Sequence, residues 1–156
     1  MPANQSTGPQ DDEAAAGHSG GHLILYDGLC GLCSRLNQFV LARDPAGAFC
    51  FASLQSALAR ASLERLGKDP EVLTTFYVVA DWRSASPTLL DKSRAALFVA
   101  RALGVPWSWV GVFSLLPGRL LDAAYDTIAR HRYRLFGRHE VCPLPSPDHI
   151  RRFIDG

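Results

Sequence analysis

The residues with the clearest chemical potential are two cysteines, Cys30 and Cys33, in the segment Asp27-Gly28-Leu29-Cys30-Gly31-Leu32-Cys33. Residues at this spacing lie on the same side of a helix, so their thiols can join in a small, reducible disulfide ring. A cysteine at a helix start also lies beside unpaired backbone N–H groups and the positive end of the helix dipole, which favour the thiolate that attacks disulfides. The spacing therefore predicts a redox-active dithiol.

The two thiols are predicted to have different roles. Cys30 is the predicted nucleophile that forms a mixed disulfide, and Cys33 is the predicted resolving thiol. Because Cys33 lies one turn deeper, we expect it to be less exposed and less acidic than Cys30. Asp27 has two interpretations, a carboxylate that relays a proton from Cys33 or a turn and cap residue. The predicted partners are a disulfide-containing protein or small thiol and a recycling reductant, and no cofactor is predicted.

A zinc site is the main alternative to the redox dithiol. His139 and Cys142 supply a second pair of ligands that could join Cys30 and Cys33 around a tetrahedral zinc ion. The two pairs lie far apart in the chain, so the sequence alone does not bring them together. Without such a partner, Cys142 has two interpretations, an extra thiol that exchanges with the active pair or a buried structural cysteine near a proline-rich turn, and the second is favoured.

The elements that position the cysteines follow from the apolar pattern. Residues 23–26 form a short apolar run that predicts a buried strand. A helix is predicted from Cys30 to about Asp44, because apolar side chains recur at helical spacing at Leu32, Leu36, Phe39 and Val40. Residues 49–54 predict a second strand, in which Cys50 is interpreted as a small buried hydrophobic residue.

The next elements complete an α/β core. Ser56 is the predicted cap of a helix that ends at Gly67, and strands are predicted over residues 74–80 and 88–90. Ser93 is the predicted cap of a further helix whose inward residues are Ala96, Leu97, Ala100 and Leu103. The resulting β-α-β-α-β-β-α order, with a CxxC pair after the first strand, is the context of a thioredoxin-like site.

A C-terminal helical extension is predicted from about residue 106. Pro117 opens and Gly137 closes a long helix, whose predicted inward residues are Leu121, Ala124, Tyr125, Ile128 and Leu135. The aromatic residues before it are interpreted as the core of the extension: Trp107, Trp109 and Phe113. A short final helix is predicted to dock three apolar side chains, Ile150, Phe153 and Ile154.

A non-enzymatic binding module is the third hypothesis. It rests on a basic cluster near the end of the long helix, formed by Arg130, His131, Arg132, Arg134 and Arg138. Such a cluster could meet phosphate or an acidic protein, although cations also stabilise a helix C-terminus and pair with local carboxylates. The formal charge of +1 predicts no nucleic-acid partner, because a dedicated binder carries a strong positive field.

Length and composition predict one domain preceded by a tail. A chain of 156 residues with 47% hydrophobic residues can build one core. Residues 1–22 contain too few apolar side chains to fold, so they predict a disordered tail with solvated histidines at His18 and His22, and residues 23–156 form the predicted redox domain. No signal segment or membrane span is predicted, which favours a cytoplasmic location, where thiols are kept reduced.

The chain also resembles a known family. Residues 27–33 resemble the signature of the DCC family of thiol-disulfide oxidoreductases. Its later motifs are matched by residues 54–56, 93–96, 117–125 and 132–138 and by Cys142. The resemblance spans about residues 23–154. It implies a thioredoxin-like fold with Cys30 and Cys33 as the redox pair.

Overall fold

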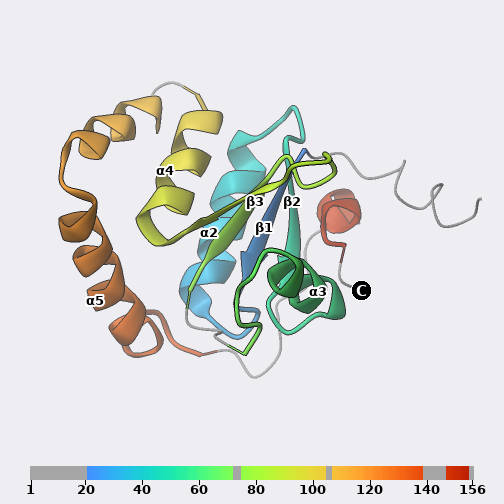
Figure 1. The fold of residues 1–156 in the computed structure, drawn as a ribbon, viewed down its shortest axis with the longest axis horizontal. Coiled ribbons are helices and arrows are strands. Elements are labelled where there is room, and N and C mark those ends of the chain that lie inside the picture. Colours follow the sequence, from blue (N-terminus) through green and yellow to red (C-terminus); the bar gives the residue numbers. More distant parts are fainter. Residues whose placement is uncertain (1–20, 72–74, 105–106, 139–146, 155–156) are drawn as a thin grey trace, which may run out of the picture.

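A four-stranded mixed sheet organises the computed structural model, which describes residues 21–71, 75–104, 107–138 and 147–154 (Figure 1). The elements are β1 (His22–Tyr26), α2 (Gly31–Arg43), β2 (Phe49–Ser53), α3 (Ala57–Arg65), β3 (Tyr77–Ala80), β4 (Thr88–Asp91), α4 (Lys92–Ala102), the 3₁₀ segment η1 (Trp107–Leu115), α5 (Gly118–Phe136) and the 3₁₀ segment η2 (Pro147–Arg152). This order confirms the predicted β-α-β-α-β-β-α core and its helical extension.

The strand order in the sheet is β2-β1-β3-β4. β1 pairs with β2 in parallel and with β3 in antiparallel orientation, and β3 pairs with β4 in antiparallel orientation. This is a thioredoxin-like arrangement. Leu25 lies opposite Tyr77, which lies opposite Asp91, so β1 ends at the same edge of the sheet where β3 begins and β4 ends. The cysteine segment follows β1 and therefore lies at this edge.

The two faces of the sheet carry separate cores, because successive side chains of a strand point to opposite faces. One face packs against α2 and α4 and includes Ile24, Phe51 and Val78 together with both cysteines of the CxxC segment. The other face packs against α3 and includes Leu23, Cys50 and Val79. Figure 1 shows α3 and α4 on opposite sides of the sheet. Cys50 is fully buried as predicted, and burial raises the pKa of its thiol to about 11.

The sequence predicted the start of α3 correctly and the start of α4 incorrectly. The Ser56 hydroxyl accepts a hydrogen bond from the Ala59 backbone N–H at 3.1 Å, which confirms the predicted cap of α3. The cap predicted at Ser93 is wrong, because α4 already begins at Lys92 and the Ser93 hydroxyl donates to Asp122 of α5 at 2.6 Å. The residues of α4 that face the core also differ from the prediction.

The residues of α4 that face the core are Ala95 and Val99, whereas Ala96, predicted to point inward, is exposed. Leu97, Ala100 and Leu103 are half-buried, because the other side of α4 meets η1 and α5 instead of the sheet. β3 begins at Tyr77, and Thr74, where the strand was predicted to start, lies outside the described residues.

The helical extension packs differently from the prediction. α5 spans the predicted residues, but its one fully buried side chain is Arg132, whereas Ala124, Ile128 and Leu135 are exposed. In η1, 75% of Trp109 and 53% of Phe113 are exposed, so they do not form the predicted core, and the Trp107 side chain is not among those described. These side chains are exposed because one side of η1 packs along α4, whereas no described residue covers the other side of η1.

The two ends of the described chain lie against the domain. Phe153 stacks on Phe51 with ring centroids 5.0 Å apart, and Ile154 packs on the α3 face, both as predicted, whereas Ile150 is exposed. His22, predicted to belong to a solvated tail, is the first residue of β1, and its ring accepts a hydrogen bond from the Asp81 backbone N–H at 3.1 Å. The rest of the predicted tail up to residue 20, including His18, lies outside the described residues. Among the helices described, none combines the length and the apolar character that a membrane crossing requires.

Candidate active site

The segment between β1 and α2 is a tight turn that delivers Cys30 to the start of the helix. The Cys30 backbone N–H donates to the Asp27 carbonyl at 3.2 Å, and the Leu29 N–H donates to the Asp27 carboxylate at 3.0 Å. Cys30 is the residue that precedes the first turn of α2, in extended backbone geometry. The predicted position of the cysteines at a helix N-terminus is confirmed, and so is the turn role of Asp27.

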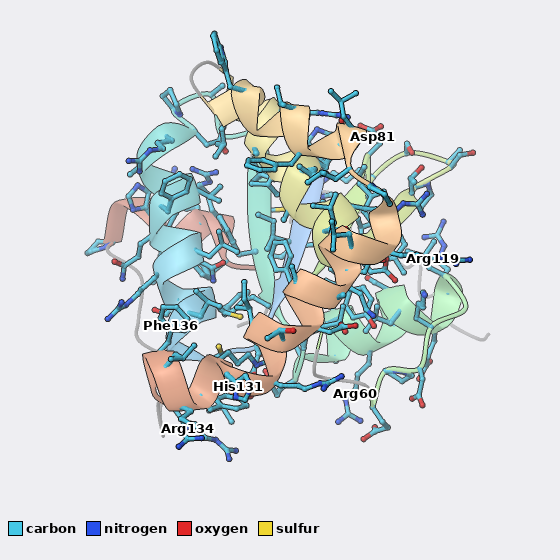
Figure 2. The ribbon with its side chains drawn as sticks, turned by 90° about the vertical axis from the view of Figure 1, so that its left-hand side faces the viewer. Arg60, Asp81, Arg119, His131, Arg134 and Phe136 are labelled. Atoms are coloured by element: carbon cyan, nitrogen blue, oxygen red, sulfur yellow. The ribbon has the colours of Figure 1, made fainter. Side chains whose placement is uncertain are left out.

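Both thiols of the CxxC pair are buried. The exposed fraction is 0% for Cys30 and 6% for Cys33, so the prediction that Cys33 is the less exposed thiol is wrong. The cause is the C-terminal end of α5, which lies over Cys30. Cys30 forms an antiparallel bridge with Arg138, and the Gly31 N–H donates to the Gly137 carbonyl at 3.3 Å. Figure 2 shows Phe136 beside the lower part of α2.

Two glycines allow this close approach between α2 and α5. A Cβ atom at Gly31 would lie 2.3 Å from the Phe136 carbonyl oxygen, which is inside van der Waals contact. Gly137 ends α5 with a φ of +78°, a conformation that other residues rarely adopt. Glycine at both positions therefore permits the backbone at the end of α5 to cover Cys30.

The two thiols differ in acidity in the predicted direction. The hydrogen bond from the Cys33 thiol is the largest cause that lowers the pKa of Cys30 to about 6, with a smaller contribution from the charge of Arg132 and opposition from burial. The same hydrogen bond, burial and the charge of Cys30 raise the pKa of Cys33 well above its ordinary value. Near neutral pH the pair thus holds one thiolate, on Cys30, and one proton, on Cys33.

Asp27 is the buried centre of a polar cluster beside the thiols. Its Oδ2 atom accepts hydrogen bonds from Arg132 Nη2 at 3.1 Å and from the Tyr133 hydroxyl. Its Oδ1 atom accepts from Gln55 Nε2 at 3.1 Å as well as from the Leu29 N–H. Asp27 therefore joins the cysteine turn to α5 and to the segment after β2.

Arg132 is the site residue that sequence reasoning missed. It was counted in the basic cluster, but it is buried and pairs with a carboxylate 105 residues away, not with a local one. The other members of that cluster, Arg130, His131, Arg134 and Arg138, are exposed. The spacing could have identified it, because Arg132 follows Tyr125 and Ala129 at helical intervals on the face that meets the core.

An apolar pocket of about 190 Å³ adjoins the dithiol between α2, α4 and α5. Cys33 and Arg132 form part of its wall, and the remaining wall is almost entirely hydrocarbon. Beside it, the Tyr125 hydroxyl accepts a hydrogen bond from the Phe76 backbone N–H at 2.8 Å. α5 is thus held against both α2 and the start of β3.

The alternative zinc set cannot be assembled from the described residues. His139 and Cys142 lie outside the part of the chain that the structure describes. Within that part, no group of three His, Cys, Asp or Glu side chains is arranged to hold a metal ion. The described cysteines, Cys30, Cys33 and Cys50, are free thiols.

Comparisons of the sequence with known proteins identify the family of this chain. A family model described as DCC1-like thiol-disulfide oxidoreductase matches residues 24–138. Uncharacterized protein YuxK of Bacillus subtilis (strain 168) is 36% identical over 132 residues, which cover 85% of this chain and 93% of the relative. DCC family protein At1g52590, chloroplastic, of Arabidopsis thaliana is 30% identical over 123 residues, 78% of this chain and 69% of the relative. No solved structure matches the chain. The chain therefore belongs to the DCC1-like thiol-disulfide oxidoreductase family.

Proposed function

We propose that this protein catalyses thiol-disulfide exchange through Cys30 and Cys33. The observation that carries the proposal is the hydrogen-bonded pair of thiols at the start of α2, whose pKa values are displaced in opposite directions. A low-pKa nucleophile beside a protonated second thiol is the arrangement that two-step exchange requires. The family description supports the same class of reaction.

In the proposed reaction, the Cys30 thiolate attacks one sulfur of a substrate disulfide. The substrate S–S bond breaks, one substrate thiolate leaves and takes up a proton, and Cys30 holds the other half as a mixed disulfide. Cys33 then loses its proton and attacks Cys30 Sγ, which releases the second substrate thiol. The protein ends with a Cys30–Cys33 disulfide, and the substrate has gained two electrons and two protons.

Asp27 enters this proposal as the acceptor of the Cys33 proton. Its carboxylate is buried at the same turn, and its backbone hydrogen-bonds Cys33 and lowers the pKa of that thiol, against the larger effects that raise it. The resolving step needs a base because Cys33 is otherwise held protonated. A recycling reductant returns the disulfide to the dithiol, and we place the reaction in the cytoplasm, with a protein or small-thiol disulfide as substrate.

The test is a redox titration of the full chain, followed by intact mass and peptide mapping. Equilibration with dithiol and disulfide buffers is expected to convert the protein reversibly to a form lighter by two hydrogens, with the new bond mapped to Cys30 and Cys33. Cys50→Ser, which alters a cysteine on the other face of the sheet, is the matched control and keeps the same midpoint. A dithiol that never closes, or that closes without reopening, would refute the proposal.

A further inference from the structure

Arg132 is an unusual residue for its position. It is the one fully buried residue described on α5, with 5% of its surface exposed, whereas Arg119, Arg130 and Arg134 of the same helix are exposed. Burying a guanidinium costs free energy unless the charge is paired and hydrogen-bonded. An apolar side chain would fill this position at a lower cost, so the buried charge calls for a reason beyond packing.

The contacts of Arg132 place its charge beside a carboxylate, on the wall of the pocket that Cys33 also lines. Arg132 Nη2 lies 3.1 Å from Asp27 Oδ2, and the guanidinium lies 4.8 Å from the centroid of the Tyr133 ring. Arg132 also shares a pocket wall with Cys33. The ion pair with Asp27 fixes the guanidinium, which reaches the cysteine turn from a helix that follows it by about a hundred residues.

The charge of Arg132 acts on both cysteines in the same direction. It lowers the pKa of Cys30 and of Cys33, although the hydrogen bond between the thiols is the larger influence on each. The other titratable or charged groups around the pair, from the turn, α2 and α5, are Asp27, Tyr125, Tyr133 and Arg138. Arg138 is exposed, so solvent screens it more than the buried Arg132.

We propose that Arg132 is the positioning residue of the dithiol, a cation that α5 and Asp27 hold in place so that the buried Cys30 thiolate is stabilised. The inference rests on the proposed function, since a stable thiolate matters because Cys30 is the nucleophile. The planar guanidinium can keep its bond to Asp27 while its charge acts on the thiols of the same pocket. Asp27 thereby has a second task, the orientation of this cation.

The experiment is a titration of the thiolate absorbance in the full-length reduced protein. Each variant is measured against the same variant carrying Cys30→Ser, so that the difference reports Cys30 alone. Arg132→Gln removes the charge and keeps an amide that can donate to Asp27. It is expected to raise the midpoint by about 0.5 to 1 pH unit, as loss of a nearby opposite charge does. Arg132→Lys is expected to restore the midpoint to near that of the parent.

Two further variants separate this effect from a structural one. Arg130→Gln removes an exposed charge from the same helix and is expected to leave the midpoint in place. Asp27→Asn removes the counter-charge but keeps an amide oxygen that can accept the Arg132 hydrogen bond and so hold the guanidinium in place. It is expected to move the midpoint downward, opposite to Arg132→Gln, because the guanidinium then acts on the thiolate unopposed. A merely structural ion pair would change the melting temperature in both variants without opposite midpoint shifts.

The proposal is overturned if Arg132→Gln keeps the parent midpoint, if Arg130→Gln shifts it equally, or if Asp27→Asn fails to lower it. Should Arg132→Gln not fold, Asp27→Asn and Arg132→Lys still decide the question. These readouts do not depend on turnover. A flat response to Arg132→Gln together with a reversible Cys30–Cys33 couple would therefore refute the role of Arg132 and leave the proposed function intact.

Discussion

At the residue scale, the proposed chemistry depends on the hydrogen bond between the two thiols, which keeps the proton on Cys33 and favours the thiolate of Cys30. Cys33 donates to Cys30, so the same contact favours the Cys30 thiolate and disfavours ionisation of Cys33. Since burial by itself raises the pKa of a thiol, as it does at Cys50, the low pKa of the buried Cys30 comes from its partners. This hydrogen bond predicts different roles for the two cysteines and a defined pH dependence for the reactivity of Cys30.

The first concerns the roles of the two cysteines. Cys33→Ser removes the proposed resolving thiol, so incubation with a disulfide substrate is expected to accumulate a mixed disulfide on Cys30. Cys30→Ser is expected to trap none, because it lacks the proposed nucleophile and burial still raises the pKa of the remaining Cys33 thiol. Non-reducing electrophoresis and peptide mapping distinguish the two variants. Trapping on Cys33 instead would reverse the assignment.

The second concerns pH. The pKa of Cys30 is lowered to about 6, so its thiolate is the major form above that pH and is lost as the pH falls through it. Alkylation of Cys30 is expected to be nearly independent of pH between about 7 and 8 and to fall about tenfold for each unit below 6. Rates measured by peptide mass at several pH values test this. A midpoint near 8.5 would show an unperturbed thiol.

At the element scale, the fit between the start of α2 and the end of α5 decides what covers Cys30. Local signals predicted both helices, because apolar spacing, the Ser56 cap and the glycine ends act within a few residues. They did not predict that Gly31 meets the Phe136 carbonyl or that Cys30 is fully buried, since both depend on a contact between segments about a hundred residues apart in the chain. The inward face of α4 was wrong because it depends on how α4 packs against η1 and α5, which the spacing of apolar residues within the helix does not reveal.

The close contact at Gly31 predicts that alanine there destabilises the protein, whereas alanine at Gly118 does not. Gly31→Ala places a Cβ atom 2.3 Å from the Phe136 carbonyl oxygen, so the two helices must separate. The free energy of unfolding is expected to fall by about 1 to 3 kcal/mol, as in overpacked cores. Gly118→Ala is the matched control. Its Cβ would meet no atom within 4 Å, so alanine there is expected to be neutral or to stabilise by up to about 1 kcal/mol. Denaturant unfolding measures both, and equal effects at the two positions would contradict the packing argument.

At the scale of the whole molecule, the helical extension covers the cysteine site that the thioredoxin-like core supplies. The sheet and its flanking helices supply the CxxC segment, and α5 returns Arg132 and Tyr133 to Asp27 at the opposite end of the chain. The sheet, its flanking helices and the CxxC segment could be predicted from the local sequence pattern. The pairing of Asp27 with α5 required the folded structure, because neither residue carries a local signal for a partner so far away.

Enclosure has a kinetic consequence, because a substrate disulfide can reach Cys30 only after the end of α5 moves. Tyr133→Phe removes one hydrogen bond that holds α5 to Asp27 and leaves the charge of Arg132 in place. Such a bond is worth about 1 kcal/mol, so the open form is expected to become about fivefold more populated. Alkylation of Cys30 at pH 8, where the thiolate is already formed, is then expected to accelerate by about the same factor. Thr127→Val, on the exposed side of the same helix, is the control and leaves the rate unchanged. An unaltered rate in Tyr133→Phe would mean that this bond does not restrain access, and that substrates reach Cys30 without displacing α5.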